Sequence, residues 1–299
     1  MKKISIIIVT YNSERDIYDC IESIKRFCDI PEKDLELIIV DNNSNHTDIM
    51  FKKITKLYGD DIILIQNTKN GGYGQGNNIG IRKASAPIIL IMNPDVRMIT
   101  PFIKEPLKAF EKDKELCMYG MKQMYSHTKE SHSSFCCTYM MNGYLRTFIE
   151  AIFNRLEWYL PQYMYFSGSC FFINKEKFEK VGLFDESIFM YGEEDDIHYR
   201  ITHKFGRHFK YNKNIKYLHL CADRKADLPY EMTMAKVAII QNEKKGYPRR
   251  KTIKNLIGMC NCRLFREWIK VHLYGKSTEW YDMLTEYHRE LVKMKNQTN

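Results

Sequence analysis

Strand-like and helix-like segments alternate through the first hundred residues, and this alternation constrains the fold more than any other feature of the sequence. Four β-branched or aliphatic runs are typical of strands buried on both faces of a parallel sheet. They occupy residues 4–9, 35–41, 62–66 and 88–92. Helical patterns separate them, and Ser13-x-x-Asp16 ahead of the first helix predicts a capping box. We therefore expect an α/β fold with a mostly parallel central sheet flanked by helices.

Polar residues follow every predicted strand. They are Thr10, Tyr11 and Asn12, then Asp41, Asn42 and Asn43, then the loop 70–78, and finally Asn93 and Asp95. In an open parallel sheet, ligands bind outside the carboxyl ends of the strands. The sequence therefore predicts one polar, glycine-rich and acidic edge of the sheet as a binding site.

Two segments at this edge contain residue types that are typical of ligand-binding sites. The loop NGGYGQGNNIG (residues 70–80) lacks the lysine of a phosphate-binding loop and only approaches the dinucleotide fingerprint, so by itself it is equally consistent with a tight turn. In Asn93-Pro94-Asp95 the proline fixes the backbone so that two oxygen-bearing side chains face the same way. Such oxygens suit a hard cation. A plain Asx-type turn is the alternative.

Five motifs occur in order along the chain: SIIIVTYNSERDI, LIIVDNNSNHTD, NGGYGQGNNIGIRKA, ILIMNPDV and LFDESIFMYGEEDDIHYRI. In this order and at this spacing they resemble the motifs of the bacterial family two glycosyltransferases of the rhamnosyltransferase-like group, and the resemblance covers about residues 3–220. It implies a GT-A fold and an inverting sugar transferase that uses a nucleoside-diphosphate sugar and a divalent metal, Mg²⁺ or Mn²⁺.

The resemblance also implies roles for individual residues. Asp41 corresponds to the family aspartate that contacts the base or ribose of the donor, and the other residues expected to bind the donor are Thr10, Tyr11, Asn12, Asn43, Asn70, Gly72, Asn78 and Asn93. Asp95 is the expected metal ligand. Asn93 replaces an acidic residue of the parent motif. This removes one negative charge, so we expect weaker binding of the metal. His219 is a candidate contact to metal or diphosphate, with a core histidine as the alternative.

The segment YGEEDDIHYR places four carboxylates in succession, from Glu193 to Asp196. Acids are favoured in the first turn of a helix, so a solvated helix start would explain them. In the family, the second acid of this motif is the catalytic base, which makes Glu194 the expected base and Asp195 the alternative if the register slips by one residue. Glu193 and Asp196 are then expected on the acceptor side. Gly168, in FSGSCFFIN, is expected to permit close approach at the floor of the cleft.

The domain organisation is predicted from pattern and charge. Residues 1–227 are expected to form the glycosyltransferase domain, with a nucleotide-sugar half at about 1–100 and an acceptor half at about 101–227. Residues 228–299 read as a basic helical region, with 14 Lys and Arg against seven Asp and Glu, hence +7 of the formal +9. Apolar residues recur with the basic ones at helical spacing. Docking on anionic lipid, packing on the rest of the chain and a homodimer contact all remain open.

Composition limits the class and the compartment. The longest apolar runs fall short of the roughly 20 residues that span a membrane, and MKKISIIIVTYNSE lacks the cleavage site of a signal peptide. The nine scattered cysteines indicate reduced thiols. We therefore expect a cytoplasmic protein, with attachment to the inner face of the plasma membrane through the C-terminal region as a further hypothesis.

The predicted function is transfer of a sugar to a hydroxyl of a glycan or lipid-linked acceptor in the synthesis of a bacterial surface polysaccharide. A catalytically weak or inactive sugar-nucleotide-binding module is the alternative, because Asn93 and Glu194 depart from the usual acids. A nucleotidyltransferase is disfavoured because no basic glycine-rich loop follows the first strand. A nucleic-acid binder is disfavoured because the positive charge is concentrated in the C-terminal region and no recognition motif occurs.

Overall fold

The protein folds into two compact units. The computed structural model describes residues 1–131, 133–138, 141–220 and 227–297. The first unit comprises residues 1–135 and 166–222, and the second comprises residues 136–165 and 223–299. The predicted boundary at residue 227 was therefore wrong in one respect, because the segment 136–165 belongs with the C-terminal helices rather than with the sheet.

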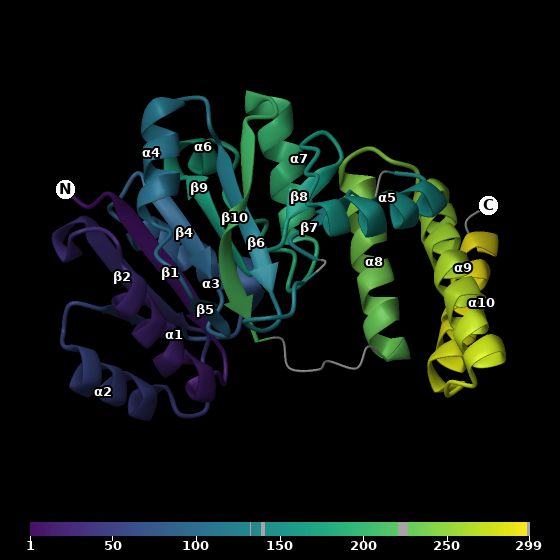
Figure 1. Cartoon of the computed structure of the whole chain (residues 1–299), viewed down its shortest axis with the longest axis horizontal. Helices are drawn as coiled ribbons and strands as arrows, with labels where there is room; N and C mark the ends of the chain where they lie inside the picture. The colour runs from purple at the N-terminus through teal and green to yellow at the C-terminus, as the bar shows by residue number, and fades with distance from the viewer. Residues whose placement is uncertain (132, 139–140, 221–226, 298–299) are drawn as a thin grey trace. The chain divides into compact units, whose positions relative to one another are not determined.

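An eight-stranded sheet forms the centre of the first unit (Figure 1), in the order β3-β2-β1-β4-β9-β6-β10-β5. Its strands are β1 (Ile4–Thr10), β2 (Leu35–Asp41), β3 (Ile63–Gln66), β4 (Ile88–Met92), β5 (Val96–Met98), β6 (Met118–Met124), β9 (Cys170–Asn174) and β10 (Phe209–His219). Six strands run in one direction, whereas β9 and β5 run antiparallel to their neighbours. The prediction of a mostly parallel sheet is confirmed.

Helices cover both faces of this sheet. They are α1 (Glu14–Phe27), α2 (Thr47–Tyr58), α3 (Gly72–Lys83), α4 (Lys104–Lys112), α6 (Lys175–Lys180) and α7 (Glu193–Phe205), with a short 3₁₀ turn at Glu32–Asp34. The predicted capping box at α1 was wrong, since the Ser13 hydroxyl donates to the Tyr11 carbonyl instead of capping the helix. The acidic first turn of α1 still complements the helix dipole.

The two faces of β1 are buried by different helices. Ile4, Ile6 and Ile8 join a core that includes the apolar residues of α1, α2 and α4. Ile7 points to the other face, where a Cβ atom on Gly80 of α3 would stand 2.5 Å from its Cγ2 atom. Because the strand is buried on both sides, its sequence is an almost unbroken aliphatic run.

The second unit is helical. Its helices are α5 (Gly143–Leu156), α8 (Leu228–Lys244), α9 (Arg249–Tyr274) and α10 (Glu279–Asn296), and the predicted C-terminal helical extension is confirmed. Ala235, Ile253, Leu284 and Leu291 belong to a core that α8, α9 and α10 share. Two short strands, β7 (Phe135–Cys137) and β8 (Met164–Phe166), form a separate two-stranded sheet where the chain passes between the units.

Two further findings concern the helices and the cysteines. Within the described residues, no helix combines the length and the apolar character needed to cross a membrane. The eight described cysteines are all free, as expected for reduced thiols, and most of them are buried.

Candidate active site

The carboxyl ends of β1, β2 and β4 lie at one edge of the sheet, as the alternation of strands and helices predicts. Thr10 and Asp41 are paired neighbours at the ends of β1 and β2, and the amide of Asn42 donates to the Thr10 carbonyl. Met92 at the end of β4 pairs with Cys170 at the start of the antiparallel strand β9. The loops that follow these strands, and the loop that precedes β9, therefore meet at this edge.

Asp41 is the centre of a buried hydrogen-bond cluster. Its carboxylate is fully buried and accepts bonds from the Thr10 hydroxyl (2.8 Å), the Ser44 amide and hydroxyl (2.8 and 2.6 Å) and the Thr47 hydroxyl (2.5 Å). Both side chains hold the loop between β2 and α2, and their contact with the donor stays a prediction.

Three of the residues predicted to bind the donor are exposed at this edge: Tyr11, Asn12 and Asn43. Asn12 and Asn43 adopt left-handed backbone conformations (φ 51° and 62°), which asparagine tolerates better than most residues. The Asn12 amide donates to the Ser44 hydroxyl at 2.8 Å, so the two loops brace each other. The three side chains lie where the sequence predicted donor contacts.

The glycine loop at the start of α3 packs against protein. A Cβ atom on Gly72 would stand 2.0 Å from the Phe189 carbonyl oxygen, and Gly72 has a φ of 87°, so both space and conformation require glycine there. The Asn70 side chain accepts a bond from the Gly72 amide. The loop therefore serves as a docking surface for the turn before α7, a role that the sequence did not predict.

Asn78 is likewise engaged within the protein. Its side-chain nitrogen donates to the Phe184 carbonyl and to Glu186 (both 2.9 Å), and its side-chain oxygen accepts the Phe184 amide (3.0 Å). The residue is 1% exposed. These polar atoms hold the loop ahead of α7, and donor binding by Asn78 stays a prediction.

Asp95 and His219 come together at the same edge. The Asp95 Oδ2 and His219 Nε2 atoms are 3.4 Å apart, and both side chains are partly exposed. Asn93 is fixed through its amide, which donates to the Ser169 carbonyl at 2.9 Å. The structure thus places the two predicted metal ligands side by side, at the end of β4 and the end of β10.

This pair of side chains fits a divalent cation that also binds a diphosphate. Among the described residues, no group of three or more His, Cys, Asp and Glu side chains is positioned to hold a metal ion. Mg²⁺ is usually bound through one or two carboxylates, with substrate phosphates completing its shell. One carboxylate and one neighbouring imidazole at an open edge match that arrangement.

The four acids lie in the first turn of α7, and only one of them is accessible. Glu193 and Asp195 are each 1% exposed and Asp196 is 7% exposed, whereas Glu194 is only partly buried. Asp196 forms an ion pair with Arg200 at 2.5 Å. Asp195 is therefore poorly placed as the alternative base, and Asp196 has a structural role within the helix.

The turn before α7 is strained. Tyr191 (φ 73°) and Gly192 (φ 92°) are both left-handed, and such a conformation costs a non-glycine residue about 1–2 kcal/mol. The backbone amide of Tyr73, in the glycine loop, donates to the carbonyl of Phe189 in this turn. This tight turn brings the first residues of α7 back toward the sheet edge.

Gly168 touches the accessible acid. A Cβ atom on Gly168 would stand 1.7 Å from the Glu194 Oε1 atom, so a larger residue would displace the carboxylate. The next residue, Ser169, accepts the Asn93 amide through its carbonyl. The loop before β9 therefore links Glu194 to the Asn93-Pro94-Asp95 turn.

Burial changes the acidity of both glutamates. Desolvation raises the pKa of Glu194 to about 7. Desolvation, and then the neighbouring Glu194 carboxylate, raise the pKa of Glu193 to about 9, and its buried Oε1 atom has no hydrogen-bond partner among the described residues. Glu193 therefore keeps its proton at neutral pH, while Glu194 exchanges its proton near neutrality.

Tyr73 is a site residue that sequence reasoning missed. Its hydroxyl donates to the Gly168 carbonyl at 2.5 Å, and its ring packs edge-on against Phe184. Burial, and then the nearby Glu194 and Glu193 carboxylates, raise the pKa of Tyr73 well above its usual value, so it stays a donor. The available signal was that Tyr73 is the only large aromatic side chain inside the glycine loop.

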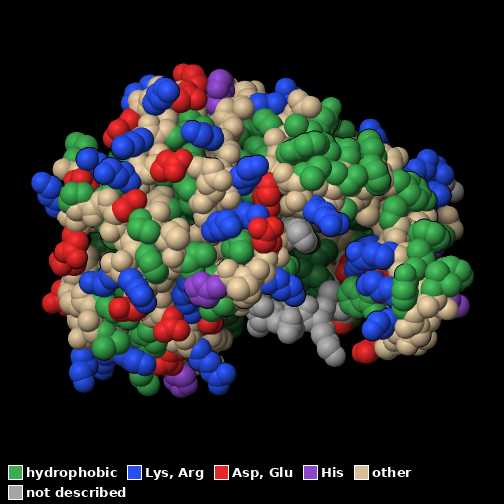
Figure 2. Space-filling view, viewed as in Figure 1, with side chains coloured by type: hydrophobic (Ala, Val, Ile, Leu, Met, Phe, Trp, Pro, Cys, Tyr) green, Lys and Arg blue, Asp and Glu red, His purple; other side chains and the backbone are tan. Residues whose placement is uncertain are grey.

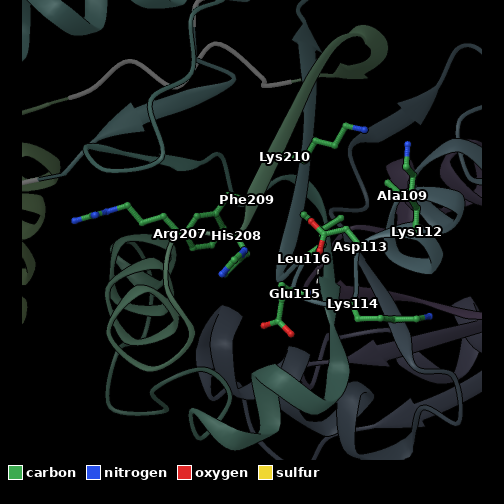
Figure 3. A pocket seen from close by; sticks show the side chains of 10 residues that line it. All are labelled: Ala109, Lys112, Asp113, Lys114, Glu115, Leu116, Arg207, His208, Phe209 and Lys210. Carbon is green, nitrogen blue, oxygen red and sulfur yellow. Dashed lines mark hydrogen bonds between the residues drawn. The ribbon is translucent and has the colours of Figure 1, made fainter.

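A cavity of about 620 Å³ opens at the opposite edge of the sheet, where β6 and β10 begin (Figure 3). The side chains of Lys112, Lys114 and Arg207 point away from one another rather than toward a common point. Ligands of open α/β sheets bind at the other edge. We therefore assign the site to the edge that holds Asp95 and Glu194.

Comparison with known proteins agrees with this assignment. Residues 5–182 match the family described as "Glycosyl transferase family 2". The chain is 28% identical over 205 residues to the low-salt glycan biosynthesis hexosyltransferase Agl10 of Haloferax volcanii, which covers 66% of this chain and 61% of that protein. It is 23% identical to the uncharacterized glycosyltransferase YfnE of Bacillus subtilis, covering 73% of this chain and 64% of that protein. The chain thus spans less than two thirds of each of these relatives.

Solved structures share the fold. The mannosyltransferase PcManGT of Pyrobaculum calidifontis, in complex with GDP-Man and Mn²⁺, superposes with a TM-score of 0.63 at 16% identity, covering 98% of this chain and 87% of that one. S. aureus TarS 1-349 in complex with UDP-GlcNAc gives a TM-score of 0.55 at 15% identity, covering 95% and 80%. At these identities the likeness concerns the fold, and it confirms the predicted GT-A architecture.

Proposed function

Since the chain belongs to glycosyl transferase family 2, we propose that it transfers a sugar from a nucleoside-diphosphate sugar to a hydroxyl of a glycan or lipid-linked acceptor, with inversion at the anomeric carbon. One observation carries the proposal. Glu194 is the one partly exposed acid of its cluster, and its carboxylate lies against Gly168 in the loop that also binds the Asn93-Pro94-Asp95 turn.

Glu194 acts as the base in this proposal. Its carboxylate removes the proton of the acceptor hydroxyl while the hydroxyl oxygen attacks the anomeric carbon, and the bond from that carbon to the diphosphate oxygen breaks on the opposite face. A positioned base contributes a factor of roughly 10² to 10⁴ to the rate, and its optimal pKa lies near the working pH. The raised pKa of Glu194, about 7, meets that requirement.

Asp95 and His219 face the leaving group in this proposal. A divalent cation bound there would neutralise the negative charge that develops on the departing diphosphate. Asp95 is the expected ligand, with His219 Nε2 at 3.4 Å from its carboxylate. Mn²⁺ together with GDP-Man in PcManGT, and UDP-GlcNAc in TarS, support a nucleotide-sugar donor and a divalent cation for this chain.

The acceptor is proposed from the relatives. Agl10 is named for glycan biosynthesis, and a further relative, a Bacillus spizizenii poly(ribitol-phosphate) beta-glucosyltransferase, is 34% identical over 94 residues that cover 31% of this chain and 15% of that protein. We place the reaction in the synthesis of a surface polysaccharide or related polymer. A hexose or deoxyhexose is the proposed sugar.

A donor screen followed by two variants tests the proposal. Purified protein is incubated with nucleoside-diphosphate sugars, saccharide acceptors and Mg²⁺ or Mn²⁺, and release of nucleoside diphosphate is measured. Glu194→Gln should lose transfer by about 10² to 10⁴ while calorimetry shows unchanged donor binding. Asp95→Ala should weaken donor binding in the presence of metal. Glu179→Gln, on an exposed part of α6, is the matched control.

Near-normal turnover by Glu194→Gln would refute the assigned base. Donor binding without turnover by the unaltered protein, under conditions that support a related transferase, would instead identify a sugar-nucleotide-binding module.

A further inference from the structure

Large apolar side chains are exposed on the C-terminal half of α9 in the second unit. Phe265, Trp268 and Leu273 are 66%, 41% and 67% exposed on one side of the helix, and Tyr274, opposite Phe265 round the helix, is 71% exposed. The neighbouring Glu267 is buried by contrast, so the helix does have an inner face. Monomeric proteins rarely place several such side chains together on one outer face, and a cluster of this kind indicates an interaction surface.

The exposed residues continue a face of α9 that α5 covers further toward its N-terminus. The ring of Tyr144 contacts Gly258, and its hydroxyl accepts a bond from the Asn261 side chain at 2.7 Å. Phe265 and Trp268 follow Asn261 at positions i+4 and i+7, on the same face of the helix. α5 therefore covers the first half of this face, and the second half presents aromatic rings to the surroundings.

α5 adds a second apolar row. Leu145, Phe148 and Leu156 are 51%, 66% and 44% exposed, and Trp158 directly after the helix is 57% exposed. Leu145, Phe148 and Leu156 lie on the side of α5 away from Asn154, which is buried. Figure 2 shows hydrophobic side chains gathered over α5. We call Leu145, Phe148, Leu156 and Trp158, together with Phe265, Trp268 and Leu273, the aromatic face.

The charge on α9 has one dominant sign. α9 contains seven Arg and Lys residues but only one acid, Glu267. That acid is 7% exposed and is already paired with Arg266 and Lys270. Lys254 is exposed near the N-terminal end of the same helix. An approaching surface would therefore meet apolar side chains flanked by positive charge.

We propose that the aromatic face docks on the surface of an anionic phospholipid bilayer. Helices that lie in a membrane interface combine Lys and Arg with Trp, Phe and Leu, and Trp and Tyr favour the headgroup region. The residues project from the outer sides of two helices, which suits insertion between lipids. A second copy of this chain would bring the same excess of positive charge to the contact, so charge complementarity favours the lipid.

This inference goes beyond the proposed transfer reaction and does not depend on it. Its test measures binding only, so a failed transferase assay and a failed lipid assay remain distinguishable. The full chain is mixed with vesicles of phosphatidylcholine alone, or of phosphatidylcholine with phosphatidylglycerol, and bound protein is separated by sedimentation. Binding is expected to the anionic vesicles and should weaken as salt is added.

Variants separate the apolar and the electrostatic contributions to vesicle binding. Phe265→Ser with Trp268→Ser should lower the partition coefficient about tenfold or more. Lys254→Gln and Arg266→Gln should each lower it roughly fivefold. Ile49→Ser with Leu57→Ser is the matched control, because these exposed residues of α2 lie in the first unit, and binding should not change. Circular dichroism checks that each variant keeps its helices.

Three results would overturn the proposal. Equal binding to neutral and anionic vesicles would show that the anionic lipid does not contribute to binding. If the α2 control variant lost as much binding as Phe265→Ser with Trp268→Ser, the loss would not be specific to the aromatic face. Absence of binding, together with a dimer in light scattering that Phe265→Ser with Trp268→Ser dissociates, would identify the aromatic face as a contact between copies of the chain.

Discussion

The Glu194 Oε1 atom lies 1.7 Å from the point at which a Cβ atom on Gly168 would stand. The requirement for glycine at this position is steric, since its backbone forms the wall against which the proposed base rests. Gly168 is also held from the other side, because its carbonyl accepts the Tyr73 hydroxyl. The position of the base therefore depends on the loop before β9 as much as on α7.

We expect Gly168→Ala to impair transfer by displacing the Glu194 carboxylate. Overpacking of this size typically costs about 1–3 kcal/mol, so the protein should remain folded while kcat falls by at least about tenfold. Steady-state kinetics together with thermal unfolding would separate the two effects. A fully active Gly168→Ala variant would contradict the assigned geometry.

The same contact predicts a rescue. Shortening the base in Gly168→Ala with Glu194→Asp makes room for the new methyl group, so the double variant should be more active than Gly168→Ala alone. A double-mutant cycle measures this coupling. Independent, additive effects of the two substitutions would show that the side chains do not share the space that the structure assigns them.

The rate of transfer should depend on pH through Glu194. A base works only when ionised, and desolvation raises the pKa of Glu194 to about 7. We expect kcat/KM to rise about tenfold per pH unit below that value and to level off above it. Rates measured from pH 5 to 9 check this, and the residual activity of Glu194→Gln should lack the acid limb.

Stability should depend on pH through Glu193. The pKa of Glu193 is raised in the folded state to about 9 by burial and by Glu194, so folding favours its protonated form. The stabilisation of the folded state by protonated Glu193 is complete below the ordinary glutamate pKa and is lost as the pH rises toward 9. The unfolding free energy should fall by up to about 1.4 kcal/mol per pH unit in that window. Glu193→Gln should flatten the curve in chemical denaturation.

Much of the architecture could be predicted from the sequence because it follows from local pattern. The run ISIIIV is buried on both faces as its composition indicates, and the order of strands and helices places Thr10, Asp41 and Asp95 at one edge. Glu194 could be selected from four consecutive acids only through a family resemblance. Its exposure relative to Glu193 and Asp195 depends on how α7 packs, and no local pattern encodes that packing.

The roles of several polar residues could not be predicted because their partners are distant in sequence. Asn78 bonds to Phe184 and Glu186, more than a hundred residues away, and Gly72 faces the Phe189 carbonyl. A glycine or asparagine that supports a remote loop has the same local sequence as one that contacts a phosphate. The segment 136–165 joined the second unit for a similar reason, since its partner helix α9 begins at residue 249.

Tyr73→Phe tests how far the glycine loop positions the base. The substitution keeps the ring against Phe184 but removes the bond to the Gly168 carbonyl, which costs about 1–3 kcal/mol when the carbonyl stays buried without a partner. We expect kcat to fall severalfold with the KM for the donor unchanged. A raised donor KM at constant kcat would instead place Tyr73 in the donor pocket.

Asn78→Ala distinguishes a structural asparagine from one that binds the donor. The side chain makes three hydrogen bonds that hold the loop before α7, and the residue is 1% exposed. Removing it leaves the Phe184 amide and carbonyl without their partner, which should destabilise the protein by about 2–4 kcal/mol. Donor affinity of the folded protein, measured by calorimetry well below the melting temperature, should stay within about twofold. Asn43→Gly, at an exposed position of the same sheet edge whose left-handed φ glycine also adopts, is the matched comparison, and it should leave stability nearly unchanged while weakening donor binding. If Asn78→Ala weakened donor binding without lowering stability, the loop-holding role assigned to Asn78 would be wrong.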